Sequence, residues 1–154
     1  MTAQYAIHSG LTALTAATAK TLVEINTGAN TPTELIKLGV SSSYLTTATP
    51  ITLTVEIGTT TATGTGTSFT PKRTGQAVGV SAATVKINDT VEPTGFSAVI
   101  AWDLTLPGDR IDYIWELGRE YFLGPITGGT SALNAIRLTA SAACSARVVA
   151  WIEE

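Results

Sequence analysis

The sequence predicts an all-β fold: a single-domain, eight-stranded antiparallel β-sandwich of the jelly-roll type with an extended N-terminal arm. Two observations lead to this prediction. Residues 51–57 alternate without exception between apolar and polar side chains, which is the pattern of a strand with one buried face. Threonine occurs 28 times in 154 residues, while charged residues make up only 14%. Because threonine is β-branched, it favours strands and can face water without charge.

The N-terminal segment, residues 1–19, is rich in Ala and Thr and carries few apolar residues. Its threonine content and its lack of a charged face argue against a helix. We predict an extended arm or edge strand around Gln4–Ser9, followed by a loose connection, with the sandwich itself spanning residues 20–154.

The remaining elements follow from apolar patterns separated by turn clusters. Strands are predicted, in order, at 20–26, 34–44, 51–57, 96–106, 111–117, 135–142 and 145–154, with shorter ones at 68–73 and 77–80 around Pro71. Gly39 within the second of these indicates a bulge or a close backbone approach. The Thr/Gly-rich segment 58–67 is expected to be a mobile surface loop or a loop ordered by a partner, and 84–95 is expected to be loop.

Composition excludes several classes of function. The net charge is −3, and Arg73 beside Lys72 is the only basic pair, so no basic stripe for nucleic acid exists. We interpret this pair as solvated or as part of an interface rim. The first residues show no signal peptide and no membrane span. Cys144 is the only cysteine, so no intrachain disulfide can form, and it is expected to be a buried thiol.

Catalytic and cofactor sites are hard to build from these residues. His8 is the only histidine, and no Gly-x-Ser-x-Gly motif is present. One His and one Cys cannot supply a zinc site without several carboxylates. On a predicted strand, Asp112 and Glu116 would lie about 13 Å apart, too far for a glycosidase pair. The Asp-rich turn near Asp109 could bind calcium but more simply caps the turn. We therefore expect no catalytic residue, no cofactor and no metal.

Several segments together resemble small virion proteins of tailed bacteriophages, especially those that infect actinobacteria. They are Ala19-Lys-Thr-Leu-Val-Glu-Ile, Glu34-Leu-Ile-Lys-Leu-Gly-Val-Ser, Glu92-Pro-Thr, Trp115-Glu-Leu-Gly-Arg-Glu and Arg147-Val-Val-Ala-Trp-Ile-Glu-Glu. The resemblance rests on their order and spacing from about Gln4 to Glu154, since each is a strand pattern rather than a chemical signature. It implies a jelly-roll capsid decoration (cement) protein, a homotrimer that clamps neighbouring subunits of the major capsid protein. It would be made in the host cytoplasm and end on the virion surface.

A cement protein needs neutral surfaces with aromatic anchors, and three weak contacts on one trimer act together through avidity. The residues we predict at such an interface are Tyr5, His8, Tyr44, Arg73, Trp102, Arg119, Glu120 and Tyr121. Of Tyr121 and its neighbour Phe122, we expect one to be buried and the other to lie nearer a partner. The alternative is a carbohydrate- or receptor-binding β-sandwich of a phage head fibre or tail. Exposed aromatic residues in a shallow row would favour that alternative.

Overall fold

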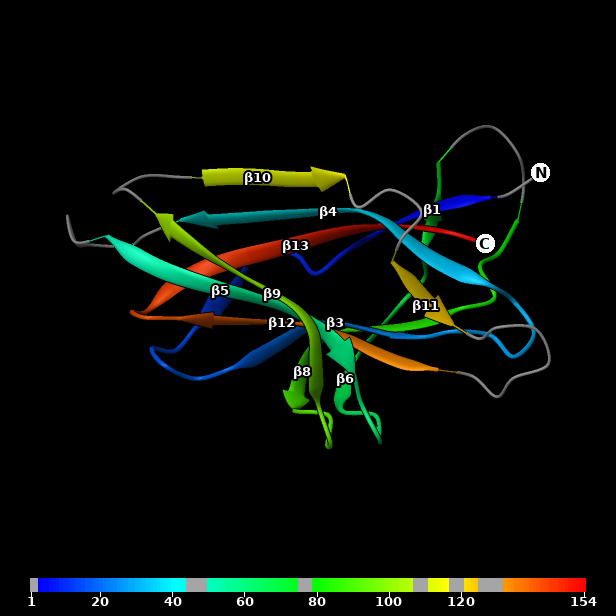
Figure 1. Cartoon of the computed structure of the whole chain (residues 1–154), viewed down its shortest axis with the longest axis horizontal. Helices are drawn as coiled ribbons and strands as arrows, with labels where there is room; N and C mark the ends of the chain where they lie inside the picture. Colours follow the sequence, from blue (N-terminus) through cyan, green and yellow to red (C-terminus); the bar gives the residue numbers. More distant parts are fainter. Residues whose placement is uncertain (1–2, 44–49, 75–78, 107–110, 117–120, 125–131) are drawn as a thin grey trace.

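The computed structural model describes residues 3–43, 50–74, 79–106, 111–116, 121–124 and 132–154, and it has two packed antiparallel sheets (Figure 1). The first sheet contains β1 (Gln4–His8), β2 (Thr12–Leu14), β4 (Thr33–Ser43), β7 (Lys72–Arg73), β10 (Ile111–Glu116), β11 (Phe122–Gly124) and β13 (Cys144–Glu153). The second contains β3 (Lys20–Asn26), β5 (Ile51–Thr59), β6 (Thr65–Phe69), β8 (Thr84–Val91), β9 (Ser97–Leu106) and β12 (Leu133–Ala140). The predicted all-β sandwich is confirmed, with more strands than the eight expected. None of the described residues belongs to a helix long and apolar enough to cross a membrane.

The strand order places elements that are distant in sequence side by side. The first sheet runs β10-β4-β13-β1-β7, with β11 also paired with β4 and β2 with β13. The second runs β6-β8-β3-β12-β5-β9. Figure 1 shows β13 between β1 and β4, and both chain ends on the same side of the molecule. There Ala3 and Glu154 exchange two backbone hydrogen bonds, of 2.9 and 3.0 Å.

The core lies between the two sheets and is built from alternate residues of the long strands. The apolar members of the 51–57 pattern are at most 1% exposed, which confirms their predicted inward orientation. They pack with other residues that are less than 2% exposed: Ile7, Leu22, Ile25, Leu35, Leu38, Ile136, Leu138 and Ile152. Cys144 is buried in the same core, as predicted, and burial raises the pKa of its thiol.

The N-terminal segment forms a strand, which is one of the two alternatives predicted around Gln4–Ser9, and does not extend as a free arm. All five residues of β1 pair with β13, from Gln4 opposite Glu153 to His8 opposite Val149, and β7 pairs with the other side of β1. Tyr5, Ile7 and Leu14 are at most 4% exposed. Residues 4–8 and 12–14 are therefore strands of the first sheet.

Two segments predicted as loops form strands. β5 continues to Thr59 and β6 begins at Thr65, so the connection between them is short. β8 occupies Thr84–Val91 and pairs with both β3 and β6. Of the predicted strand 77–80, residues 77–78 lie outside the described part, and residues 79–80 are not in a strand.

The bulge in β4 lies three residues before Gly39. Leu35 pairs with Ile152 and Lys37 with Trp151, which leaves Ile36 as the extra residue. Gly39 itself pairs regularly with Val149 on one side and Ile114 on the other. A shifted register, rather than the glycine, bends this strand.

Candidate functional site

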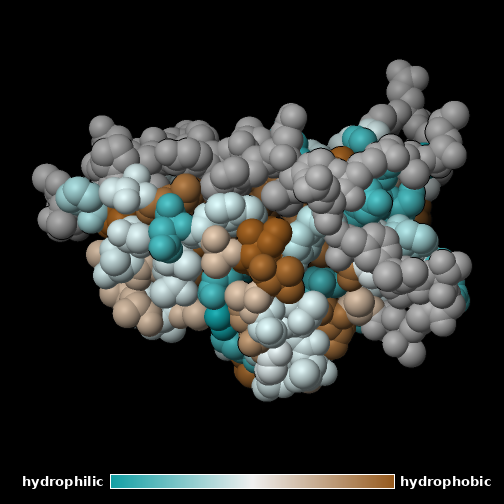
Figure 2. All heavy atoms as spheres, in the orientation of Figure 1, coloured by the Kyte–Doolittle hydropathy of each residue, from teal (hydrophilic) through white to brown (hydrophobic). Residues whose placement is uncertain are grey.

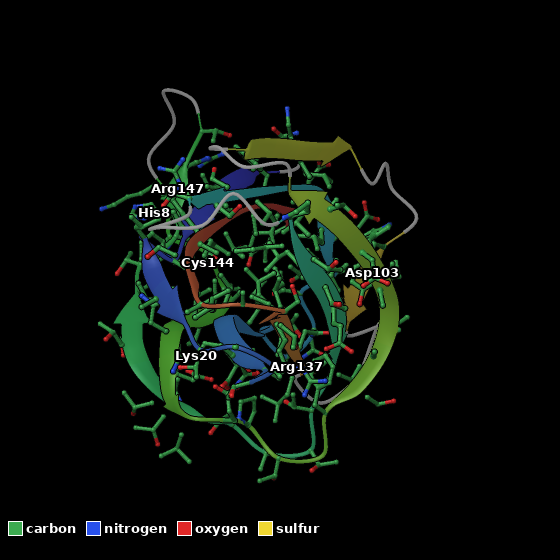
Figure 3. The ribbon with its side chains drawn as sticks, turned by 90° about the vertical axis from the view of Figure 1, so that its left-hand side faces the viewer. His8, Lys20, Asp103, Arg137, Cys144 and Arg147 are labelled. Carbon is green, nitrogen blue, oxygen red and sulfur yellow. The ribbon has the colours of Figure 1, made fainter. Side chains whose placement is uncertain are left out.

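The predicted interface residues that lie in the described part of the chain do not gather on one surface. Tyr5 and Tyr121 lie in the core, 4% and 8% exposed, and burial raises the pKa of Tyr121 to about 12. His8 is exposed, and its ring meets that of Phe69 edge-on at 4.9 Å between centroids. In Figure 3, His8 and Asp103 of β9 lie on opposite sides of the sandwich.

The other predicted interface residues lie on separate strands or outside the described part of the chain. Arg73 is half-buried on β7, next to β1, and Trp102 is half-buried on β9. Tyr44, Arg119 and Glu120 lie outside the described residues, as does the side chain of Phe122. Among the predicted residues that the structure places, Arg73 and Trp102 lie on strands at the edge of a sheet. β7 has only two residues, whereas β9, which carries Trp102, has ten.

β9 is an open edge of the second sheet. Within the described part of the chain it pairs with β5 and with no other strand, over Ile51–Thr59. Its ten residues include no Pro, Lys or Arg, and Asp103 is its only charged residue. Asp103 accepts a hydrogen bond of 2.6 Å from the Thr54 hydroxyl. Natural sheets commonly protect long edges with lysine, proline or a cover, because an open edge can pair with another chain.

Apolar side chains of β9 that stand beside the core are not fully covered. Ile100, Trp102 and Leu104 stand opposite Ile57, Val55 and Leu53 of β5. The three β5 residues are fully buried, whereas the three β9 residues remain partly exposed. Figure 2, in the same orientation as Figure 1, shows hydrophobic atoms reaching the surface over the middle of β9. A further strand or flat surface placed here would complete their burial.

A bulge fixes the start of β9. Ile57 pairs with Ile100 and Gly58 with Ala98, so Val99 is the extra residue, and its side chain is 62% exposed. Phe96, just before the strand, packs over Gly58, and the Arg137 guanidinium lies 3.8 Å from the Phe96 ring centroid. Arg137 also forms a salt bridge of 2.9 Å with Glu56. These contacts hold the bulge and direct the Val99 side chain toward solvent.

Two further features of the described residues bear on a metal site or a ligand site. No three His, Cys, Asp or Glu side chains among them lie close enough together to hold a metal ion. A cleft of about 400 Å³ lies between β3, β6 and β8 and is lined by Glu24, Asn26, Phe69 and Lys86 among others.

Sequence reasoning did not find the open edge or the cleft. Segment 96–106 was predicted as a strand, but its position at the edge depends on which distant strands pair, and no local pattern reports this.

No family model matches the sequence, and no curated protein matches it.

Proposed function

We propose that this chain is a structural virion protein of a tailed phage: a jelly-roll decoration protein that assembles as a homotrimer and binds the major capsid protein. Synthesis in the host cytoplasm and a final place on the capsid surface belong to the same proposal. The chain would bind and stabilise the shell and perform no catalysis.

The strand order supports a jelly roll. Without the short strands β2 and β11 and the consecutive strands β6 to β8, eight strands remain in chain order: β1, β3, β4, β5, β9, β10, β12 and β13. The first of them pairs with the last, the second with the seventh, the third with the sixth and the fourth with the fifth. This is a long hairpin of paired strands rolled into two sheets, the architecture of many viral capsid domains and lectins. β6, β7 and β8 form an insertion between its fourth and fifth strands.

The observation that carries the functional proposal is the open edge at β9. We assign it to contact with a neighbouring copy of this chain. The edge is neutral except for Asp103, and the apolar side chains along it are only partly covered. Subunit contacts bury such residues at their centre and exclude charge there.

The carbohydrate-binding alternative would need exposed aromatic rings. Among the described residues, the strongly exposed large hydrophobic side chains are Leu11, Val80, Val91 and Val99, and none is aromatic. Phe96 lies against Arg137, and Trp151 has the Lys37 ammonium 5.4 Å above its ring. The placed surface therefore favours assembly over sugar binding.

Val99→Lys tests the assigned edge. A lysine at this bulge should leave the fold intact, because Val99 is 62% exposed, but it should block a neighbouring strand through charge and bulk. We expect the molar mass, measured by light scattering on a sizing column, to fall from that of a trimer to that of a monomer. Val91→Lys on β8 is the matched control, because Val91 is equally exposed at 62%. A Val99→Lys protein that stays trimeric would contradict the assignment of β9.

A further inference from the structure

Two acidic side chains are buried against each other on the outer side of the second sheet. Glu24 on β3 is 2% exposed and Asp89 on β8 is fully buried. The backbone N–H of Gly64 donates a hydrogen bond of 2.8 Å to Glu24 Oε2. Both carboxyl oxygens of Asp89 are buried with no hydrogen-bond partner among the described residues, and the Glu24 carboxyl is close enough to raise the pKa of Asp89.

The segment after β5 lies directly on this acid pair. A Cβ atom added at Gly64 would be 2.5 Å from Asp89 Oδ2. One added at Gly66 would meet the other oxygen, Oδ1, even more closely. Since only glycine permits such an approach, the Gly64-Thr-Gly sequence is explained by the acid pair beneath it. The link from Gly64 into β6 is thus held by the two carboxyl groups.

The surrounding charges do not fully neutralise the pair. Lys86 donates to the Gly64 carbonyl at 2.8 Å, and Lys20 donates to the Asp89 carbonyl. Glu92 lies nearby, 3.9 Å from the Lys20 ammonium, and accepts a bond of 2.8 Å from the Thr21 N–H. Three carboxylates and two ammonium groups would carry a net charge of −1 if all were ionised. One bound proton makes the group neutral.

We propose that Glu24 and Asp89 share one proton and form, with Gly64 and Gly66, a pH-sensitive clasp that holds the start of β6 against the second sheet. When the proton leaves, two adjacent buried carboxylates repel each other, and the least costly relief is movement of the glycine segment that covers them. Because Glu24 and Lys86 also line the 400 Å³ cleft, movement of the glycine segment would expose the pair to water and allow it to exchange the proton.

The direction of the pH effect follows from the pKa of Asp89. Burial, and then the Glu24 carboxylate, raise this pKa from 3.8 to about 7, while Lys86 lowers it by a smaller amount. Since the pKa is higher in the folded than in the unfolded chain, the stabilisation by the clasp is fully present below pH 3.8. It is lost progressively as the pH rises from there through the folded pKa of about 7.

The clasp would act on the opposite edge of the second sheet from β9. β6 is the last strand on that side, and the chain continues directly from it into β7, which pairs with β1 in the first sheet. Opening would therefore loosen a connection between the two sheets without requiring a change at β9. The inference is independent of the assembly proposed above.

Hydrogen exchange by mass spectrometry at pH 6 and pH 8.5, corrected for the intrinsic pH dependence of exchange, tests this inference. We expect protection of the amides from Gly64 to Phe69 to fall at least about tenfold at the higher pH, while β12 stays protected. Asp89→Asn should abolish this difference, because an asparagine can donate to Glu24 at any pH. Asp103→Asn on β9 is the control and should behave as the wild type does.

Protection that does not change with pH, or an Asp89→Asn protein that retains the change, would overturn the clasp. A titration of the Asp89 carboxyl carbon by NMR gives a second test that needs no variant. A midpoint near 7 agrees with the shared proton. A midpoint near the ordinary value of 3.8 would contradict it.

Discussion

A chain that lacks residues 1–14 is expected not to fold. The deletion removes β1, whose five residues pair with β13, and β2, which pairs with Cys144–Ala146 of the same strand. It also removes three core side chains and leaves β13 without one of its central neighbours. Three buried side chains at roughly 2–5 kcal/mol each are comparable with the roughly 5–15 kcal/mol by which a domain is stable.

A single substitution in β1 shows how much one of its core side chains contributes to the free energy of unfolding. Ile7 is fully buried, so Ile7→Ala is expected to lower the free energy of unfolding by about 3 kcal/mol. Leu11→Ala is the control, because Leu11 is 67% exposed and should change stability by less than about 0.5 kcal/mol. Urea denaturation followed by circular dichroism measures both. A truncated chain that still unfolds cooperatively would restore the interpretation of this segment as a detachable arm.

Gly58→Val is expected to be nearly as damaging as the loss of a core side chain. A Cβ atom at residue 58 would collide with the Ser97 carbonyl oxygen and lie 2.8 Å from the Phe96 ring. The Ser97 carbonyl is backbone and cannot swing away, so β9 must shift from β5 at the bulge. We expect a loss of about 3 kcal/mol in the free energy of unfolding.

Thr59→Val is the control for this variant, since Thr59 neighbours Gly58 but its side chain is exposed. Thermal unfolding should show a large decrease in Tm for Gly58→Val and almost none for Thr59→Val. Equal stability of the two variants would mean that β9 does not pack on Gly58 as described here.

Sequence patterns predicted the strands whose side chains alternate or are continuously apolar. Residues 51–57, 20–26 and 145–154 were predicted within one or two residues, because burial on one or both faces leaves a readable pattern. β1 was harder to assign, since only Tyr5 and Ile7 of its five residues are buried. Its place in the sheet depends on β13, which lies at the other end of the chain.

β8 shows why the local sequence predicted a loop where the structure has a strand. Asn88-Asp89 has the composition of a turn, and Asn88 does adopt a positive φ of 54°. However, its side chain accepts a hydrogen bond from the Thr12 hydroxyl and donates one to the Ser9 carbonyl, 76 and 79 residues away. Asp89 is buried against Glu24 from another strand. These partners turn a loop-like sequence into a strand, and nothing nearby in the sequence reports them.

The candidate site was predicted less well than the fold. The sequence shows which residues are aromatic or charged, but not which of them the packing buries. Tyr5 and Tyr121 were chosen as anchors and lie in the core, whereas Val99 was not chosen and projects from the open edge. An edge is a property of the whole strand order, so it becomes visible only when both sheets are assembled.

The molar mass of the wild-type protein in solution tests whether the chain assembles as a trimer. Light scattering on a sizing column should give three times 15.9 kDa, independent of concentration over the micromolar range. That result agrees with a trimer joined at its sheet edges and able to bind a shell through three contacts at once. A monomer of 15.9 kDa at every concentration would contradict the assembly through β9 on which the proposed function rests.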